Sequence, residues 1–297
     1  MSEQVGKGTG AKGVSLLYRP INKYWKFLMW LPVIWLVISF GIIGYSLATT
    51  GEALKKDIEL SGGKLIEVEV GSVNMEGLQQ KMPFASFRLL SGSRSVLLVQ
   101  IPFEMDEKQV FDQLKTFVEV RSEPSFRTVE PLLGDIFFQQ VQIALVVAFI
   151  FMAFVVFVLF RSFVPSTAVV LAAITDIVGT IGVMNLLNIE LSLPVVAALL
   201  TLIGYSVDTD ILLTSRLLKS GALSLEDLPG RISEAMSTGL TLTLTALAAL
   251  ISLQIFTNSF VLESIAKVLI IGLVIDIFAT WLTNAGILRW WLKRRAK

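Results

Sequence analysis

The chain has 297 residues, of which 54% are hydrophobic and only 16% are charged, and its net charge is +1. Soluble domains carry about 25% charged residues, so this composition indicates several membrane spans rather than one large soluble core. The small net charge predicts no nucleic-acid partner. The absence of Cys and His excludes disulfides, thiolate chemistry and the commonest metal ligands. The chain also lacks a G-x-x-x-x-G-K-[ST] motif, so we expect no metal, no cofactor and no nucleotide-driven motor.

Six apolar runs are long enough to cross the roughly 30 Å of hydrocarbon in a bilayer, which takes about 20 helical residues. The first run follows a long basic segment and is too long for the apolar part of a signal peptide, so we expect an uncleaved anchor. The expected spans are residues 27–48, 136–160, 164–187, 193–215, 237–256 and 261–288, with an N-terminal tail over 1–26, a loop over 216–236 and a basic tail over 289–297.

The Lys and Arg residues predict how these spans are oriented, because cytoplasmic loops carry an excess of basic residues. Both termini are rich in Lys and Arg, Arg161 lies between the second and third spans, and Arg216 and Arg231 lie between the fourth and fifth. The alternate loops, NIELS and FTNSF, have none, and the nearest exception is Lys267 near the start of the sixth span. We therefore expect a multi-pass protein of the cell membrane with cytoplasmic termini and with residues 49–135 outside the cytoplasm.

The external residues form one domain with alternating strand and helix patterns. GKLIEVEV alternates as a strand does, and FASFRLL and RSVLLVQIPF are typical of paired strands joined by the turn SGSR. SVNMEGLQQKM and DEKQVFDQLKTFVEV predict helices, and PSFRTVE predicts a closing strand. The order β-α-β-β-α-β is that of a ferredoxin-like fold. The expected fold class is therefore an α-helical polytopic membrane protein of six transmembrane helices with one α+β ferredoxin-like external domain.

Four aspartates lie well inside the expected spans, and they are Asp176, Asp208, Asp210 and Asp276. An ionisable residue at the centre of a membrane helix costs roughly 2.5–3.5 kcal/mol on insertion scales, so it usually faces protein or water. No Lys or Arg lies at comparable depth to neutralise these carboxyls. Because such carboxyls can bind and release protons, we expect them to couple ion movement to function. The alternative is that each aspartate only hydrogen-bonds a Ser or Thr of a neighbouring helix.

Asp208 and Asp210 cannot share one helical face, because positions two apart are separated by about 200° around a helix. Asp208 shares its stripe with Gly204, whereas Asp210 shares its stripe with Ser206. At most one of the two carboxyls therefore points at any one neighbouring span. Arg216 lies near the expected cytoplasmic boundary, where its long stem reaches the interface, so we expect it to anchor the helix rather than to pair with Asp208.

Two motifs resemble those of the SecD/SecF family, membrane subunits of the RND superfamily that assist protein export through the Sec channel. GYSVDTDILLTSRLL resembles the family's fourth-span motif, and DIELSGGKLIEV resembles its acidic-x-x-Gly-Gly motif after the first span. IGLVIDIFATWLTNAGIL is similar to the last span of archaeal-type SecF. Six spans with one external domain after the first is the family's layout, and the compact domain favours SecF over SecD. The motif positions are Glu59, Gly62, Gly63, Gly204, Tyr205, Ser206, Asp208, Asp210 and Arg216.

The resemblance implies a subunit that pairs with a SecD-like protein and uses the proton gradient through its membrane aspartates. The other implied partners are the Sec translocation channel, the translocating polypeptide and membrane lipid. Asp208 matches the aspartate of SecD-type motifs, and Asp176 matches one in the third span of bacterial SecF. This chain reads DTD over residues 208–210 where bacterial SecF motifs read Asn-Asp-Thr, and its fifth span lacks the arginine of the bacterial proteins. These departures leave the partner of each carboxylate open. The two glycines of the second motif are expected to permit a tight turn into the first strand.

Three other functions use similar features. A half of an RND-type exporter of small molecules or lipids would keep the fold, although such exporters generally carry larger external domains. A passive scaffold for the Sec channel would need no ion coupling, and the missing arginine favours it. An intramembrane aspartyl protease also needs membrane aspartates, typically one in Gly-x-Gly-Asp, which this chain lacks. We therefore expect no enzymatic activity and no catalytic residue.

Overall fold

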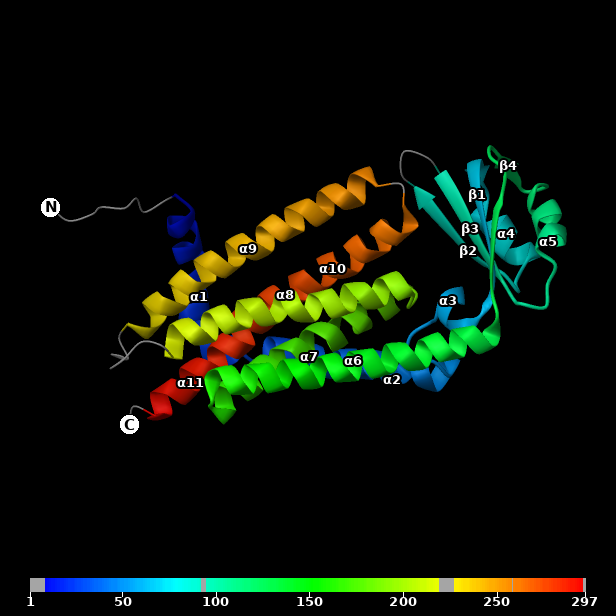
Figure 1. Cartoon of the computed structure of the whole chain (residues 1–297). Coiled ribbons are helices and arrows are strands. Elements are labelled where there is room, and N and C mark those ends of the chain that lie inside the picture. The colour runs from blue at the N-terminus through cyan, green and yellow to red at the C-terminus, as the bar shows by residue number, and fades with distance from the viewer. Residues whose placement is uncertain (1–8, 92–94, 219–226, 258, 296–297) are drawn as a thin grey trace.

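The computed structural model describes residues 9–91, 95–218, 227–257 and 259–295. Long helices run side by side as an elongated bundle, and a small sheet domain lies at one end of it (Figure 1). Helices α1 (Thr9–Leu28) and α11 (Ala285–Arg295) lie at the opposite end. The expected turn SGSR, the expected loop over 216–236 and the two expected tails lie partly outside the described residues.

Six helical segments of the described chain are long and apolar enough to span a membrane. This confirms the prediction of a multi-pass membrane protein. Proline is the first or second residue of four of them, where the first helical turn has no hydrogen bond to lose. The segments are α2 (Leu31–Thr50), α6 (Pro131–Phe160), α7 (Phe163–Leu186), α8 (Leu193–Leu218), α9 (Leu228–Phe256) and a last one made of α10 (Phe260–Phe278), the π-helical turn η1 (Ala279–Asn284) and α11.

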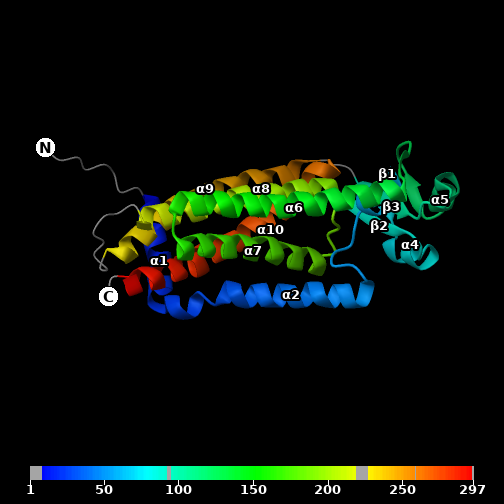
Figure 2. The ribbon, with the colours of Figure 1, turned by 60° about the horizontal axis from the view of Figure 1, so that its bottom comes forward.

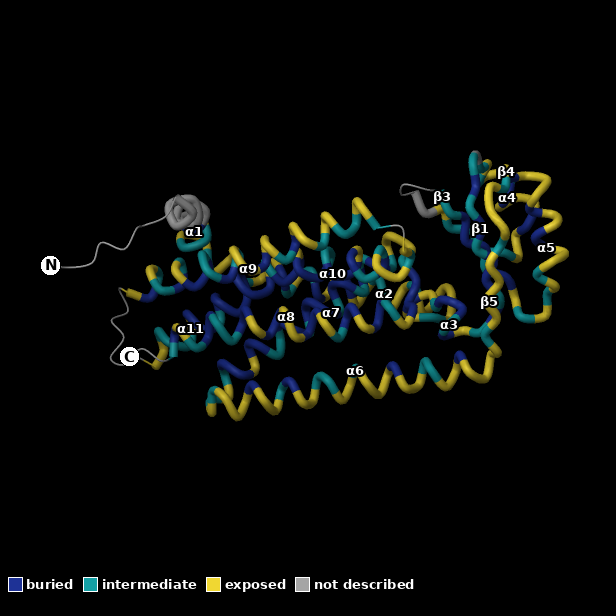
Figure 3. The backbone as a smooth tube through the Cα atoms, turned by 45° about the horizontal axis from the view of Figure 1, so that its top comes forward, coloured by how far each residue is buried: buried dark blue, intermediate teal, exposed yellow. Residues whose placement is uncertain are grey.

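Helices α7, α8 and α10 form the centre of the bundle. In α7, 61% of the membrane stretch is buried, compared with 11% in α6 and 17% in α2. Helix α6 is exposed along most of its length (Figure 3), and α2 lies on the outer side of α7 (Figure 2). Gly272 lets α10 approach α8, because a Cβ there would lie 2.2 Å from a methyl carbon of Leu202. The three central helices are therefore the ones that can shield polar side chains from lipid.

The sheet domain is an antiparallel sheet with two helices on one face. Strand β1 lies inside the sheet, which has the order β2-β3-β1-β4, and β5 also pairs with β1. The pairing is antiparallel throughout, with β4 along the second half of β1 and β5 along the first half. The strands are β1 (Gly63–Val73), β2 (Ser86–Ser91), β3 (Ser95–Ile101), β4 (Val118–Val120) and β5 (Ser125–Val129), and the helices are α4 (Met75–Lys81) and α5 (Glu107–Leu114).

The predicted helix over DEKQVFDQLKTFVEV is wrong beyond Leu114. The helix begins after Asp106, whose carboxylate caps it, and it ends at Leu114. Val118 and Val120 instead form β4 and pair with β1. β-branched residues pack well on a sheet, and here the cross-strand pairing outweighs the helical periodicity. Leu114 and Val118 nevertheless lie in the same apolar core, beneath the buried side chains of β1.

Part of the expected N-terminal tail forms helix α1, which lies across the end of the bundle (Figure 2). Its Tyr18 is buried in an apolar cluster with Leu217 of α8 and Ile232 of α9. Lys23 and Lys26, by contrast, are exposed. Helix α1 therefore packs against the bundle through Tyr18 and leaves these two lysines exposed.

Candidate functional site

Three of the four membrane aspartates meet in the centre of the bundle. Asp176 comes from α7, Asp210 from α8 and Asp276 from α10, and each is at most 1% exposed. They come together because α8 packs against both α7 and α10. We call these three residues the acidic cluster.

Hydroxyl side chains of α8 hold two of these carboxyls. The hydroxyl of Ser206 donates to Oδ2 of Asp176 over 2.5 Å. The Oγ1 of Thr209 lies 3.3 Å from Oδ2 of Asp276 and 2.8 Å from the carbonyl oxygen of Ser206. Because Thr209 has a single hydroxyl proton, it can donate to only one of these acceptors at a time. A protonated Asp276 can instead donate to the oxygen of Thr209, and both contacts are then satisfied.

The π-helical turn η1 supplies the remaining donors. The Oγ1 of Thr280 lies 2.9 Å from Oδ1 of Asp210 and 3.0 Å from Oδ1 of Asp276. The side-chain amide of Asn284 donates to the same Asp210 oxygen over 2.6 Å. One hydroxyl cannot donate to two carboxylates at once, so both Thr280 bonds form only when one of the two carboxyls carries a proton. π-helical turns inside α-helices occur frequently at functional sites.

No basic side chain in the described part of the chain bonds to the acidic cluster. Oδ1 of Asp176 and Oδ2 of Asp210 also have no hydrogen-bond partner. Burying several unpaired charges is expensive, so the arrangement is suited to carboxyls that take up protons rather than to fixed charges. The described residues contain no group of three or more acidic side chains placed to hold a metal ion.

Asp208 lies on the other side of α8 and does not join the acidic cluster. It is exposed together with Gly204 and Tyr205, whereas Ser206 and Asp210 are buried. This is the separation predicted from the helical repeat. Asp208 lines a hollow of about 430 Å³ whose walls come from α8, α9 and α10. The two aspartates of the motif therefore have different surroundings.

Arg216 lies at the end of α8 and contacts α9. Its Nη2 donates to the hydroxyl of Thr238 over 3.1 Å. The contact joins the last turn of α8 to the first half of α9, two turns beyond Asp208 in the sequence. The anchoring role of Arg216 stays a prediction.

Thr280 and Asn284 were not predicted from the sequence. Together with Asp276 they are spaced by four residues in the last span, so they form one polar stripe. That spacing was the available signal. The stripe faces α8, where Asp210 accepts hydrogen bonds from both residues.

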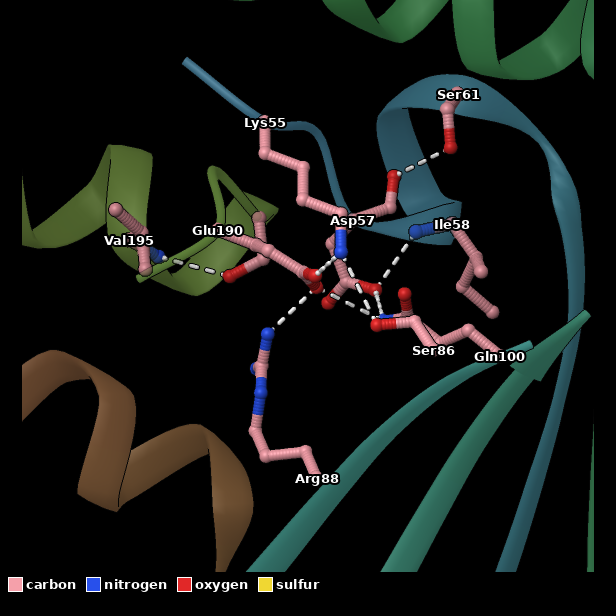
Figure 4. Close-up of polar contacts among 10 residues, drawn as sticks. Lys55, Asp57, Ile58, Ser61, Ser86, Arg88, Gln100, Glu190 and Val195 are labelled. Atoms are coloured by element: carbon pink, nitrogen blue, oxygen red, sulfur yellow. Dashed lines mark hydrogen bonds and ion pairs between the residues drawn. The ribbon is translucent and has the colours of Figure 1, made fainter. Parts of the chain in front are cut away.

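A second group of buried carboxyls joins the sheet domain to the bundle, and Figure 4 shows how its side chains converge. Glu190, in the loop between α7 and α8, pairs with Lys55 over 2.7 Å and with Arg88 of β2 over 2.5 Å. The side-chain amide of Gln100 on β3 donates to Glu190 over 3.1 Å and to Asp57 over 2.6 Å. Glu190 and Asp57 are each 4% exposed. We call these five residues the junction cluster. It was not predicted from the sequence.

Asp57 titrates at a higher pH than an ordinary aspartate. Burial raises its pKa from 3.8 to about 6, and repulsion from Glu190 and Glu59 adds to the increase. The backbone N–H of Ile58, which donates to Asp57 over 2.7 Å, and the nearby charge of Arg88 lower the pKa. Burial has the larger effect, so the pKa of this carboxyl stays above its ordinary value.

The acidic-x-x-Gly-Gly motif ties the same region to α8 and α6. The carboxylate of Glu59 accepts a hydrogen bond from the N–H of Leu193, the first residue of α8, over 3.1 Å. Gly62 has a φ of 75°, and a Cβ there would lie 2.5 Å from the Cα of Pro131 at the start of α6. Gly63, with a φ of 137°, leads into β1. Besides the predicted turn, Gly62 therefore provides close contact between α6 and the short helix α3 (Ile58–Ser61).

Most of the chain matches proteins of a known family. Residues 109–294 match the family described as "Protein export membrane protein SecD/SecF, C-terminal". The chain belongs to the SecD/SecF family. Two relatives named protein-export membrane protein SecF are each 37% identical to it. The match to the protein from Methanothermobacter thermautotrophicus covers 97% of this chain and 100% of the relative. The match to the protein from Methanocaldococcus jannaschii covers 93% of this chain and 99% of the relative. The predicted resemblance to archaeal-type SecF is confirmed.

Solved structures of SecDF share the fold of this SecD/SecF member. A crystal structure of SecDF from Thermus thermophilus, described as a translocon-associated membrane protein, matches with a TM-score of 0.72 at 20% identity, over 98% of this chain and 40% of that one. A SecDF structure in a "Super-membrane-facing form" matches with a TM-score of 0.58 at 19% identity, and the match covers 92% of this chain and 39% of that one. The chain thus spans about two fifths of these SecDF chains.

Proposed function

We propose that this protein is the SecF-type subunit of a SecD/SecF complex that assists polypeptide translocation and draws on the proton gradient. Family membership supports the role in protein export. The observation that carries the ion-coupling part is the acidic cluster, in which hydroxyls rather than basic residues of the described chain join three buried carboxyls. Protons are the ligands that complete such a network, because each shared hydroxyl needs a protonated carboxyl on one side.

Proton binding at the acidic cluster changes how α8 and α10 contact each other. When Asp210 or Asp276 carries a proton, Thr280 bonds to both and the two helices are bridged. When both carboxyls are ionised, two negative charges compete for one hydroxyl and repel each other in a site of low dielectric. Loss of the proton therefore weakens the α8–α10 contact, and its return restores it.

Helix α8 connects the acidic cluster to the sheet domain. Its first residue, Leu193, is held by Glu59, and the loop before it carries Glu190 of the junction cluster. Asp210 lies about 26 Å farther along the helix, at about 1.5 Å per residue. A movement of α8 at Asp210 is thereby transmitted to the sheet domain through two contacts at its far end. In export, this domain binds the emerging polypeptide or moves it.

The face of α8 that carries Asp208 supports pairing with a SecD-type subunit. A carboxylate left in lipid costs roughly 2.5–3.5 kcal/mol, so an exposed Asp208 requires protein or water beside it. The hollow lined by Asp208 provides space for side chains of a partner. The match to only 40% of a SecDF chain also supports a second membrane half as partner.

The orientation follows from the basic residues of the short loops. Arg161 ends α6 at the end of the bundle that carries α1 and α11, and the positive-inside rule supports a cytoplasmic location for this end. The sheet domain is then extracytoplasmic. Its strand order and antiparallel pairing support a ferredoxin-like class.

Export kinetics in inverted membrane vesicles test the proposed function. Asp210→Asn keeps the shape of the side chain but removes its titration, so we expect vesicles with this variant to export at the rate of wild-type vesicles treated with an uncoupler. Asp112→Asn, an exposed change on α5, is the matched control and keeps the response to the uncoupler. If Asp176→Asn, Asp210→Asn and Asp276→Asn all keep the wild-type response, ion coupling is wrong and the passive scaffold is the better account.

Pairing is tested separately by purification of the tagged chain from native membranes in mild detergent. Recovery of a SecD-type subunit in comparable amount supports the complex. Its absence, with the chain itself intact, refutes the pairing without affecting the family assignment.

A further inference from the structure

Cationic side chains gather at the end of the bundle formed by α1 and α11. Arg289 of α11 is 8% exposed, and its guanidinium lies 5.0 Å from the ring centroid of Trp25 on α1. The ammonium of Lys293, one turn farther along α11, lies 5.4 Å from the same ring. Lys26, the next residue of α1, is exposed and close enough to repel Lys293. Two positive charges therefore lie against one tryptophan, and a third lies near Lys293.

The guanidinium of Arg289 has a buried donor without an acceptor. Nη1 of Arg289 reaches the carbonyl oxygen of Asn22 only at 3.5 Å, and its buried Nε has no hydrogen-bond partner. Within the described chain, no acidic side chain forms an ion pair with Arg289, Lys293 or Lys26. Buried charges in proteins are normally paired, because desolvation is otherwise uncompensated. The site therefore lacks an anion.

The surrounding side chains place the site at the depth of lipid headgroups. Tyr24, Phe27 and Trp30, which lie just before the first span, are 55%, 77% and 55% exposed. Trp290, next to Arg289, is also exposed. Exposed aromatic residues at the end of a membrane bundle mark the boundary between hydrocarbon and headgroups. Helix α1 lies across this end (Figure 2), and its Lys23 and Lys26 are exposed.

We propose that Arg289, Lys293 and Lys26 bind the phosphate of an anionic phospholipid. The planar guanidinium of Arg289 presents parallel N–H donors that match phosphate oxygens, and the two ammonium groups add charge around it. Basic pockets between membrane helices bind lipid headgroups in this manner. The bound phosphate joins α1 to α11 through a ligand that the membrane itself supplies. The inference does not rest on ion coupling at the acidic cluster.

The size of the hollow beside Arg289 favours a lipid over a free anion. The hollow is lined by Tyr18, Trp25 and Arg289 among others, and its volume is about 10 Å³. That is close to the space of a single water molecule, so a phosphate rests at its mouth rather than inside it. An anion held only at a surface needs a second attachment, and the acyl chains of a phospholipid provide one along the exposed apolar side chains of α2.

Native mass spectrometry of the full chain tests this site. The protein is delipidated in detergent and titrated with phosphatidylglycerol, with phosphatidylcholine of the same acyl chains, and with inorganic phosphate. We expect one phosphatidylglycerol to bind more tightly than either of the other two ligands. Arg289→Gln weakens that binding about tenfold, the loss expected for a charge-assisted contact to phosphate. Arg295→Gln, which removes the same charge from the same helix at a residue stacked on Trp291, is the matched control and changes binding less than about threefold.

A second variant guards against a folding defect, because Arg289 is buried. Lys26→Gln changes an exposed side chain and weakens phosphatidylglycerol binding about threefold without lowering the unfolding temperature of the lipid-free protein. Equal binding of the two lipids, or wild-type binding by both Arg289→Gln and Lys26→Gln, overturns the proposal. Inorganic phosphate that binds as tightly as phosphatidylglycerol identifies a free-anion site and overturns the lipid assignment.

Discussion

The acidic cluster and the junction cluster both bury carboxyls, but their surroundings differ. In the junction cluster, Glu190 has Lys55 and Arg88 as ion-pair partners. In the acidic cluster, Asp210 and Asp276 meet hydroxyls and one amide. Ion pairs with two cations hold Glu190, whereas carboxyls that share hydroxyls form a complete network only when protons are added. The first arrangement suits a permanent attachment and the second suits an exchange site.

The largest expected effect tests the attachment. Glu190→Gln removes one charge and leaves Arg88 and Lys55 without their anion, so we expect the free energy of unfolding to fall by about 2–3 kcal/mol. The loss is smaller than for a fully buried pair because the side chains of Lys55 and Arg88 are 58% and 30% exposed. Thermal unfolding in detergent measures it, with the exposed Glu76→Gln as control. A loss below about 0.5 kcal/mol would mean that the junction cluster does not hold the sheet domain to the bundle.

The next effect concerns the pH dependence of the same attachment. Folded Asp57 keeps its proton up to about pH 6, whereas the unfolded chain releases it near 3.8. The folded state therefore binds the extra proton between these values, and stability falls as the pH rises through this window, by roughly 2–3 kcal/mol. Unfolding temperatures at steps from pH 4 to pH 7 measure the decline. Asp57→Asn removes the decline in stability that comes from this carboxyl, and the control Asp112→Asn keeps it. Identical pH profiles for the wild type and Asp57→Asn contradict the raised pKa of Asp57.

A smaller effect tests the bridge in the acidic cluster. Thr280→Val keeps the shape of the side chain but removes the hydroxyl between Asp210 and Asp276, so we expect a loss of about 1 kcal/mol. Denaturant titration followed by tryptophan fluorescence measures it. Thr241→Val, on the exposed side of α9, serves as the control. If the two variants are equally stable, Thr280 does not join the carboxyls.

The smallest effect distinguishes the two clusters most sharply. Asp210→Asn replaces a carboxyl with a neutral group of the same shape, which an exchange site tolerates, so we expect stability to change by less than about 1 kcal/mol. The substitution is chemically the same as Glu190→Gln, but its cost is several times smaller. Unfolding of both variants in one detergent provides the comparison. A loss at Asp210 as large as that at Glu190 would show that both clusters hold fixed charges.

Features that depend on local periodicity were predictable from the sequence. Hydropathy predicts the six spans, and the helical repeat predicts that Asp208 and Asp210 face apart. The structure separates these two residues as expected but buries Asp210 and exposes Asp208. Which side is buried depends on how α8 packs between α7 and α10, and the pattern of a single helix does not determine that packing.

Features that depend on contacts between distant segments were not predictable. Glu190 meets Gln100 across 90 positions of the sequence, and neither residue belongs to a recognisable motif. In the sequence, Arg88 is one polar residue of a predicted strand. Only the packing of the sheet against the bundle brings it to Glu190. Asp276, Thr280 and Asn284 have helical spacing, but their hydrogen bonds to Asp210 depend on the position of α8 opposite them.

The π-helical turn η1 has a consequence for the rotational phase of the last span. Such a turn holds one residue more than the α-helical repeat accommodates, so it offsets the faces of α10 and α11 by about 100°. Asp276 before the turn faces the acidic cluster, while Arg289 after it faces Trp25 at the far end of the bundle. Deleting one residue from this turn would rotate one of these groups away from its partner with no change in its chemical identity. The number of residues between the two sites therefore determines the direction in which Asp276 and Arg289 face.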